Sequence, residues 1–150
     1  MVVARSQFAL LHLGEMIRNR EVQRNYLAIV DGFPKEDGVI DLPLARHTHD
    51  RLKFAVSPQG KSAVTHYHVV RQVRQGTLLW LTLGTGRTHQ IRVHLAHHHW
   101  PVREDPLYNP KKTGNGQLLH AARLAFVHPR TNVWLEFMEP PPEKMQKELC

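Results

Sequence analysis

The chain has 150 residues, 41% of them apolar, so it is long enough to bury the core of one domain and has the composition of a folded globular protein. Twenty Lys and Arg against thirteen Asp and Glu give a formal charge of +7, which favours a polyanionic partner such as RNA. The single cysteine, Cys150, excludes an internal disulfide and a cysteine-rich zinc site, and the absence of a long apolar run or a signal peptide leads us to expect a cytoplasmic protein with no membrane partner.

The first half of the chain predicts one helix followed by strands. Ser6 is a candidate N-cap for a helix that ends at about Arg18, and Phe8 and Leu11 lie on its apolar face. Hydrophobic alternation and turn residues then predict the remaining elements of this half: a strand at 24–30, a turn at 31–38, a short extended piece after it, and an antiparallel hairpin from strands at 63–71 and 77–83.

Residues 84–95, with the sequence GTGRTHQIRVHL, are the most informative stretch. Gly84 and Gly86 permit a sharp turn after the preceding strand, and Thr88 is a candidate N-cap for a helix over 88–98. On that helix Ile91 lies one turn from an apolar leucine and faces inward.

Arg92 lies beside the inward stripe of that helix. An arginine so close to apolar packing is costly unless a carboxylate, phosphate or carbonyl oxygen meets it. The residues alone leave two interpretations open: a structural salt bridge or solvated helix face, and a functional cation.

The rest of the chain predicts an irregular surface connection, two strands and a short tail. Residues 100–116 are rich in proline, lysine, glycine and asparagine, which is typical of a loop, and we expect this loop to face RNA. Strands at 118–127 and 133–138 flank a turn at 128–132, and residues 143–150 are short, charged and helix-compatible. The elements predict one α+β domain over residues 1–150, with a mixed, mainly antiparallel sheet and flanking helices.

Four segments in this order resemble the RluA-type pseudouridine synthases, which isomerise uridine to pseudouridine in ribosomal or transfer RNA. They are the tyrosine strand at 24–32 (RNYLAIVDG), the segment at 38–44 (GVIDLPL), the helix motif at 86–95 (GRTHQIRVHL) and the late strand at 119–129 (LHAARLAFVHP). The resemblance implies an isomerase that acts on RNA and needs no metal or organic cofactor. We also expect a monomer.

The same resemblance implies a nucleophilic aspartate in a His-Arg-Leu-Asp loop, which these 150 residues lack. Residues 1–5 look like the end of the strand that follows that loop. We therefore expect the chain to be the downstream part of a catalytic domain and to be inactive alone.

Residue roles follow from the resemblance. Arg92 would pair with the missing aspartate and keep it ionised, and Tyr26 would lie against the target uracil. Ile91 would form an apolar wall under the flipped base, a role that is compatible with core packing. The remaining motif residues could contact phosphate, cap the helix or form scaffold hydrogen bonds: Arg87, Thr88, His89 and Gln90. For His89 and Gln90 the scaffold role is favoured.

Basic loop residues are further candidates for phosphate contact, although each is equally compatible with a solvated surface charge. They are Lys53, Lys61, Arg103, Lys111 and Lys112. The family usually has a Gly-Asp pair and a Tyr-Gly pair after the central helix, where this chain has Glu104-Asp105 and Tyr108-Asn109. These departures put the conformation of the loop after the central helix in question.

Two alternatives remain from other functional classes. The twelve histidines, including His94 and His98 at helical i,i+4 spacing, suggest a metal-dependent hydrolase as one alternative. No His-Glu-x-x-His pattern accompanies them. A non-catalytic RNA-binding fragment is the other alternative.

Overall fold

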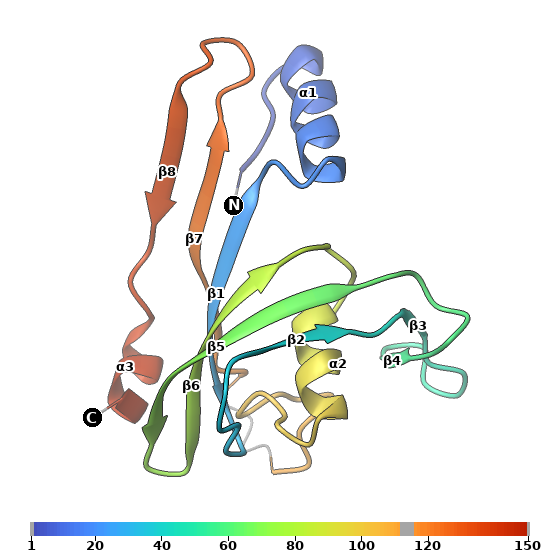
Figure 1. The fold of residues 1–150 in the computed structure, drawn as a ribbon, viewed down its shortest axis with the longest axis vertical. Helices are drawn as coiled ribbons and strands as arrows, with labels where there is room; N and C mark the ends of the chain where they lie inside the picture. Colours follow the sequence, from blue (N-terminus) through green and yellow to red (C-terminus); the bar gives the residue numbers. More distant parts are fainter. Residues whose placement is uncertain (1, 112–115, 150) are drawn as a thin grey trace.

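The computed structural model describes residues 2–111 and 116–149, which form a six-stranded sheet, a two-stranded sheet and three helices (Figure 1). The large sheet has the order β2-β5-β6-β1-β7-β8 and is antiparallel throughout, which confirms the predicted α+β class. No helix in the described ranges is long and apolar enough to cross a membrane. The elements are α1 (Gln7–Arg18), β1 (Gln23–Val30), β2 (Gly38–Asp41), β3 (Leu44–Arg46), β4 (Phe54–Val56), β5 (Val64–Val73), β6 (Gly76–Leu83), α2 (Gln90–His97), β7 (Leu119–Val127), β8 (Trp134–Met138) and α3 (Glu143–Leu149).

Strand β1 is central because both of its faces are covered along its second half. Successive side chains of a strand point to opposite faces. Ala28 and Val30 therefore belong to the cluster that contains Ile91 and Leu95 of α2, while Ile29 packs in a second cluster with α3. Helix α2, which carries the helix motif, therefore covers one face of β1, and α3 covers the other.

Helix α1 begins where its sequence predicts. The Ser6 hydroxyl accepts a hydrogen bond from the Ala9 amide at 3.2 Å, and the helix ends at Arg18. None of its residues is buried, however, and its apolar side chains Phe8 and Leu11 are exposed. The helix stands at the end of the molecule beside the tip of the β7–β8 hairpin (Figure 1).

The prediction that residues 100–116 form only a surface connection is wrong for the described part of this segment. Val102 is fully buried and forms a β-bridge with Val30, and Asp105 is buried as well. Arg103, expected to contact phosphate, is also buried, and it donates hydrogen bonds to Asp31 at 2.8 Å and to Glu148 at 2.6 Å. These carboxylates satisfy the guanidinium internally, which leaves it without a role at the surface.

The other expected basic contacts have different outcomes. Lys53 lies 3.8 Å from Asp50, Lys61 and Lys111 are exposed, and Lys112 lies outside the described residues.

Residues 2–5 adopt neither helix nor strand. The short β3–β4 ladder, which the sequence analysis did not predict, projects to one side of the large sheet (Figure 1).

Helix α3 should contribute measurably to stability through its buried Met145. Met145 is fully buried among Ile29, Leu78 and Leu118, so Met145→Ala is expected to lower the free energy of unfolding by about 2–4 kcal/mol. Urea denaturation measures the loss. The exposed Lys147→Ala on the same helix is the matched control and should change stability by less than about 0.5 kcal/mol. Equal effects would show that α3 does not pack as described.

Candidate active site

The turn before α2 is held by the side chain of Gln90. Its Oε1 accepts hydrogen bonds from the Arg87 amide at 3.0 Å and the Thr85 hydroxyl at 2.7 Å. Its Nε2 donates to the Val64 carbonyl at 2.9 Å and the Thr65 hydroxyl at 3.0 Å. Because both ends of the buried amide are satisfied, Gln90 connects the 85–87 turn to strand β5.

Helix α2 begins two residues later than the sequence analysis predicted. The N-cap is His89, in the left-handed region at φ 56°, and no side chain caps the helix. Thr88 is exposed and lies in the turn, so its prediction as the N-cap is wrong. The physical reason is the Gln90 side chain, which already accepts the Arg87 amide hydrogen bond and tightens the chain into a turn there.

A directed hydrogen-bond chain continues from Gln90 to His94, which is fully buried. His94 Nε2 lies 2.9 Å from the Leu42 carbonyl oxygen, which can only accept, so this nitrogen carries the proton. Its Nδ1 then accepts from the Thr65 hydroxyl at 2.9 Å. Burial is the largest influence on His94 and lowers its pKa below the ordinary value of 6.5, so the neutral form holds α2 against β5.

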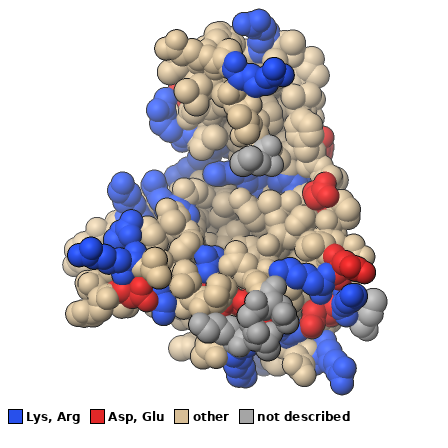
Figure 2. Space-filling view, turned by 180° about the vertical axis from the view of Figure 1, so that it is seen from behind, with Lys and Arg blue, Asp and Glu red and all other residues tan. Residues whose placement is uncertain are grey.

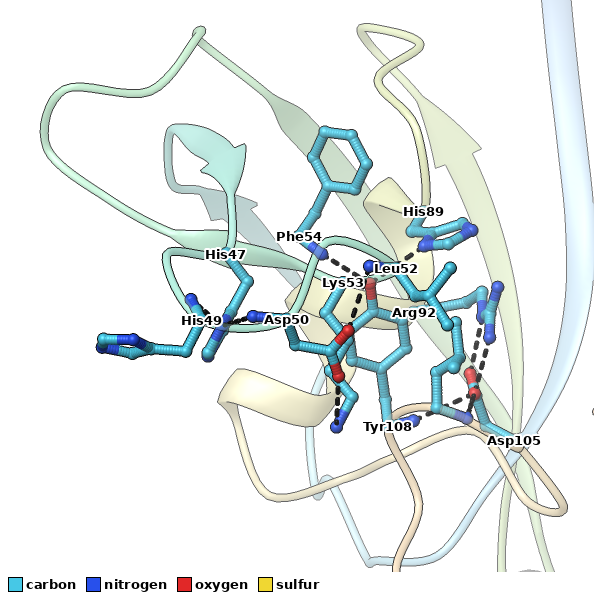
Figure 3. Close-up of polar contacts among 11 residues, drawn as sticks. His47, His49, Asp50, Leu52, Lys53, Phe54, His89, Arg92, Asp105 and Tyr108 are labelled. Atoms are coloured by element: carbon cyan, nitrogen blue, oxygen red, sulfur yellow. Dashed lines mark hydrogen bonds and ion pairs between the residues drawn. The ribbon is translucent and has the colours of Figure 1, made fainter.

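Arg92 forms a two-pronged ion pair with Asp105. Its Nε donates to Oδ2 and its Nη2 to Oδ1 of Asp105, each at 2.7 Å, and the carboxylate is fully buried (Figure 3). Burial is the largest single influence and raises the pKa of Asp105, but the hydrogen bonds from Arg92 and from the Leu107 and Tyr108 amides outweigh it. The pKa of Asp105 is therefore lowered and the pair is ionised.

The pair leaves part of the Arg92 guanidinium unused. A guanidinium has five N–H groups in one plane, and Asp105 takes two of them along the Nε–Nη2 edge. Among the described residues, no hydrogen-bond acceptor meets the Nη1 group, and the Tyr108 ring covers the guanidinium at 5.1 Å. Arg92 is thus held rigidly by one carboxylate while it keeps donors for a second anionic group.

The sequence departure at Glu104 does not disrupt this arrangement. Glu104 adopts φ 61°, a conformation that glycine enters more easily than glutamate. In this conformation the loop places Asp105 against Arg92, which is the path that a glycine at position 104 would allow. The conformational cost falls on Glu104, not on the ion pair.

Tyr108 connects the β3–β4 hairpin to the same cluster. Its hydroxyl accepts a hydrogen bond from the Phe54 amide at 2.9 Å and lies 2.9 Å from His89 Nδ1 (Figure 3). Burial, followed by repulsion from Arg92, lowers the pKa of His89 and favours its neutral form, which shares a hydrogen bond with the Tyr108 hydroxyl through Nδ1. The hairpin, the N-terminus of α2 and the loop after it meet at this hydroxyl.

The structure brings Tyr26 and Ile91 together. Tyr26 lies on β1 between Leu81 of β6 and Ala121 of β7, and it packs partly buried against the cluster that contains Ile91. Arg92 follows Ile91 directly on α2. The apolar wall and the rigid arginine therefore lie on adjacent positions of one helix.

Arg87 and Thr88 lie apart from this apolar wall, at the surface. Both are exposed and line a hollow of about 460 Å³ together with Arg46 and Lys61. The Arg87 Nε donates to the Ser62 carbonyl at 3.0 Å. This hollow is open to solvent and bordered by cations, which suits an anionic ligand.

The histidine-rich segments show no metal centre in the described ranges. No group of three or more His, Cys, Asp or Glu side chains there has a geometry that could hold a metal ion. His94, one half of the i,i+4 pair, uses both ring nitrogens in hydrogen bonds. The metal-dependent alternative has no supporting arrangement in these residues.

Sequence reasoning missed Asp105 and Tyr108 as members of the site. Both residues were noted only within the departures from the usual pairs of the family. The demand of Arg92 for an anionic partner was the signal that could have found Asp105. No spacing rule relates a helix residue to a carboxylate thirteen positions later in an irregular loop.

Comparisons with known proteins give a consistent result. Residues 1–97 match the family model described as RNA pseudouridylate synthase. An uncharacterized RNA pseudouridine synthase of Bacillus subtilis is 45% identical over 148 residues, covering 97% of this chain and 49% of that protein. Ribosomal large subunit pseudouridine synthase D of Escherichia coli is 39% identical, covering 97% of this chain and 49% of that protein. The chain therefore spans about half the length of the curated relatives it matches.

A solved structure agrees with these sequence comparisons. Human RNA pseudouridylate synthase domain containing 1 has a TM-score of 0.79 and 25% identity, covering 93% of this chain and 63% of that chain. The likeness extends over nearly all of the fold described above.

Protonation of His94 should destabilise the fold. Because its pKa is lowered in the folded state, the unfolded chain binds the proton first as the pH falls. The contribution of His94 is fully present above the unfolded pKa of 6.5 and is lost as the pH falls from there through the lowered folded pKa. Urea midpoints from about pH 7.5 to about pH 5.5 should decline for the wild type and decline less for His94→Gln, whatever its absolute stability. Parallel declines would contradict the assignment.

Proposed function

The chain belongs to the RNA pseudouridylate synthase family, and we propose that it provides the arginine and tyrosine side of an active site that isomerises uridine to pseudouridine in RNA. The observation that carries this proposal is the rigid, partly unused guanidinium of Arg92, next to Ile91 and on the Tyr26 side of the sheet. An ordinary structural ion pair would not require an open donor edge beside an apolar wall. Asp105 already neutralises the arginine, so the remaining edge is available to hold another carboxylate.

Each residue then has a defined task. Arg92 holds a nucleophilic aspartate ionised and oriented, since an adjacent cation lowers a carboxylate pKa. Tyr26 supplies a ring that stacks against uracil and a hydroxyl for a polar or proton-transfer contact. Ile91 forms the apolar wall beneath the base. Arg87 and Thr88 serve phosphate contacts at the surface, while Gln90 and His89 position the turn.

The reaction breaks the bond between uracil N1 and C1′, rotates the base and rejoins it through C5, which loses its proton while N1 gains one. A base within a duplex cannot present its sugar carbon, so the uridine is flipped out or already unpaired, at a cost of a few kcal/mol. Aromatic stacking and phosphate contacts offset this cost. The chemistry needs no cofactor, and the nucleophile is proposed to come from a segment upstream of these residues.

The RNA is proposed to be ribosomal or transfer RNA. The printed name of the Escherichia coli relative, a ribosomal large subunit enzyme, favours large-subunit ribosomal RNA. The reducing cytoplasm is the proposed location, which the single cysteine of the chain supports. We propose that residues 1–150 form one domain, the downstream part of the catalytic domain, and that the protein acts as a monomer.

The first test is pseudouridine mapping in total RNA from cells that lack the gene. Rescue by the complete reading frame is compared with rescue by residues 1–150 alone, and restored sites are expected only with the longer form, because it would supply the nucleophile. If neither form restores a lost site, the catalytic proposal fails. If residues 1–150 succeed, the account of the nucleophile is wrong and a residue within this chain takes its place.

The second test replaces the arginine within the longer form. Arg92→Lys keeps the charge but loses the fork that serves Asp105 and a second carboxylate, so the rate of pseudouridine formation should fall by about 100-fold or more. The exposed Arg74→Lys is the matched control and should retain activity. Thermal melting separates lost chemistry from lost folding. Near-wild-type activity of a folded Arg92→Lys variant would remove Arg92 from the mechanism.

A further inference from the structure

Four arginines surround a hollow beside the candidate active site. The hollow has a volume of about 250 Å³ and is lined by Arg18, Arg20, Arg24 and Arg87 together with the 84–86 turn. We call it the arginine hollow. The Gly86–Arg87 segment lines both this hollow and the larger hollow described above.

The guanidinium of Arg24 has no internal partner in the described part of the chain. Its Nε is the one buried side-chain nitrogen or oxygen there that lacks a hydrogen bond. A buried, unsatisfied N–H of a charged group is costly, so such an atom calls for a ligand that supplies the acceptor. The buried arginines Arg92 and Arg103 both have carboxylate partners, whereas the half-buried Arg24 has none among the described residues.

The charges around the hollow are equally uncompensated. Among the described residues, Arg20 and Arg24 form no ion pair, and Arg87 donates only to a carbonyl. Arg18 reaches Glu15 at 4.0 Å, and both of these side chains are exposed, so this contact neutralises little. Figure 2 shows Lys and Arg side chains along a hollow across the molecule, below the end that carries α1.

The end of α1 does not need these arginines. Its last carbonyl groups accept hydrogen bonds from the backbone amides of Asn19, Arg20 and Glu21. The Arg20 backbone adopts φ 65°, a conformation that is uncommon for a residue with a side chain. Gly86 permits the close approach of Arg24, since a Cβ there would lie 2.6 Å from Arg24 Nη1. The glycine therefore makes room for the Arg24 guanidinium, although no described residue accepts a hydrogen bond from it.

The position of the hollow relates it to the uracil site. Arg24 and Tyr26 lie on the same face of β1 and are two residues apart, about 7 Å along a strand. A nucleotide whose base lies at Tyr26 would place a neighbouring phosphate near this hollow.

We propose that the arginine hollow binds a phosphate of the RNA backbone next to the flipped uridine, with Arg24 as its central ligand. The inference rests on the proposed function, because it takes RNA as the substrate. A guanidinium supplies a planar pair of donors that fits phosphate oxygens, and three neighbouring cations add attraction. A carboxylate from another protein segment is the competing occupant, but a single carboxylate would leave most of this charge uncompensated.

Binding of a short RNA hairpin with uridines in its loop tests the proposal, measured by fluorescence anisotropy over a series of salt concentrations with the 150-residue chain. Arg24→Gln should weaken binding on the order of tenfold at moderate salt. It should also reduce the slope of log affinity against log salt by about one, since one phosphate contact is lost. Arg24→Lys should keep most of the slope but lose part of the affinity.

Arg74→Gln is the matched control because it removes the same charge from an exposed position between β5 and β6. Equal effects of Arg24→Gln and Arg74→Gln on affinity and slope would overturn the phosphate site. Unchanged RNA binding, together with a loss of thermal stability that Arg24→Gln causes in the longer form but not in the 150-residue chain, would overturn it in favour of a carboxylate from another segment of the protein.

The two proposals can fail separately. Loss of the phosphate site with intact rescue of pseudouridine sites leaves the synthase proposal standing. No RNA binding by the wild-type chain, together with failed rescue by the complete reading frame, would overturn both.

Discussion

The buried ion pair between Arg92 and Asp105 is the constraint on which the candidate site depends. Two buried charges are tolerable only when their geometry is good and their remaining hydrogen-bonding capacity is satisfied. Here the pair is two-pronged, and the amides of Leu107 and Tyr108 complete the coordination of the carboxylate. The loop after α2 must therefore follow one path, and Tyr108 is carried to a fixed place over the guanidinium.

A second set of contacts fixes the other side of α2. The amide of Gln90, the hydroxyl of Thr65 and the ring of His94 form one chain of donors and acceptors whose direction the Leu42 carbonyl determines. Because each member satisfies the next, rotation or shift of α2 would leave several buried groups without partners. The rigidity of Arg92 thus has two sources, one on each side of the helix that carries it.

How far the sequence predicted this arrangement depended on whether the decisive contacts are local. Ser6 caps α1 three residues away, and alternation along β1 and β6 is a local pattern, so these elements were predicted correctly. The N-cap at Thr88 was wrong because a side chain, Gln90, stabilises a turn that propensity alone does not reveal. Asp105 was missed because its role depends on a loop path that only the folded chain defines, and the roles of Tyr26 and Arg92 remain predictions.

The distribution of charge separates the arginines into two kinds. Arg92 and Arg103 are buried and matched by carboxylates, so they contribute little to the field outside the protein. The Lys and Arg side chains that outnumber the carboxylates, and so give the formal charge of +7, are therefore ones that lack such partners. Arg24 is the unusual member of that set, because its Nε is buried and yet has no hydrogen-bond partner among the described residues. A guanidinium in this state is a structural arginine whose partner is not part of the described chain, and its position on β1, two residues from Tyr26, makes the substrate the partner that the geometry favours.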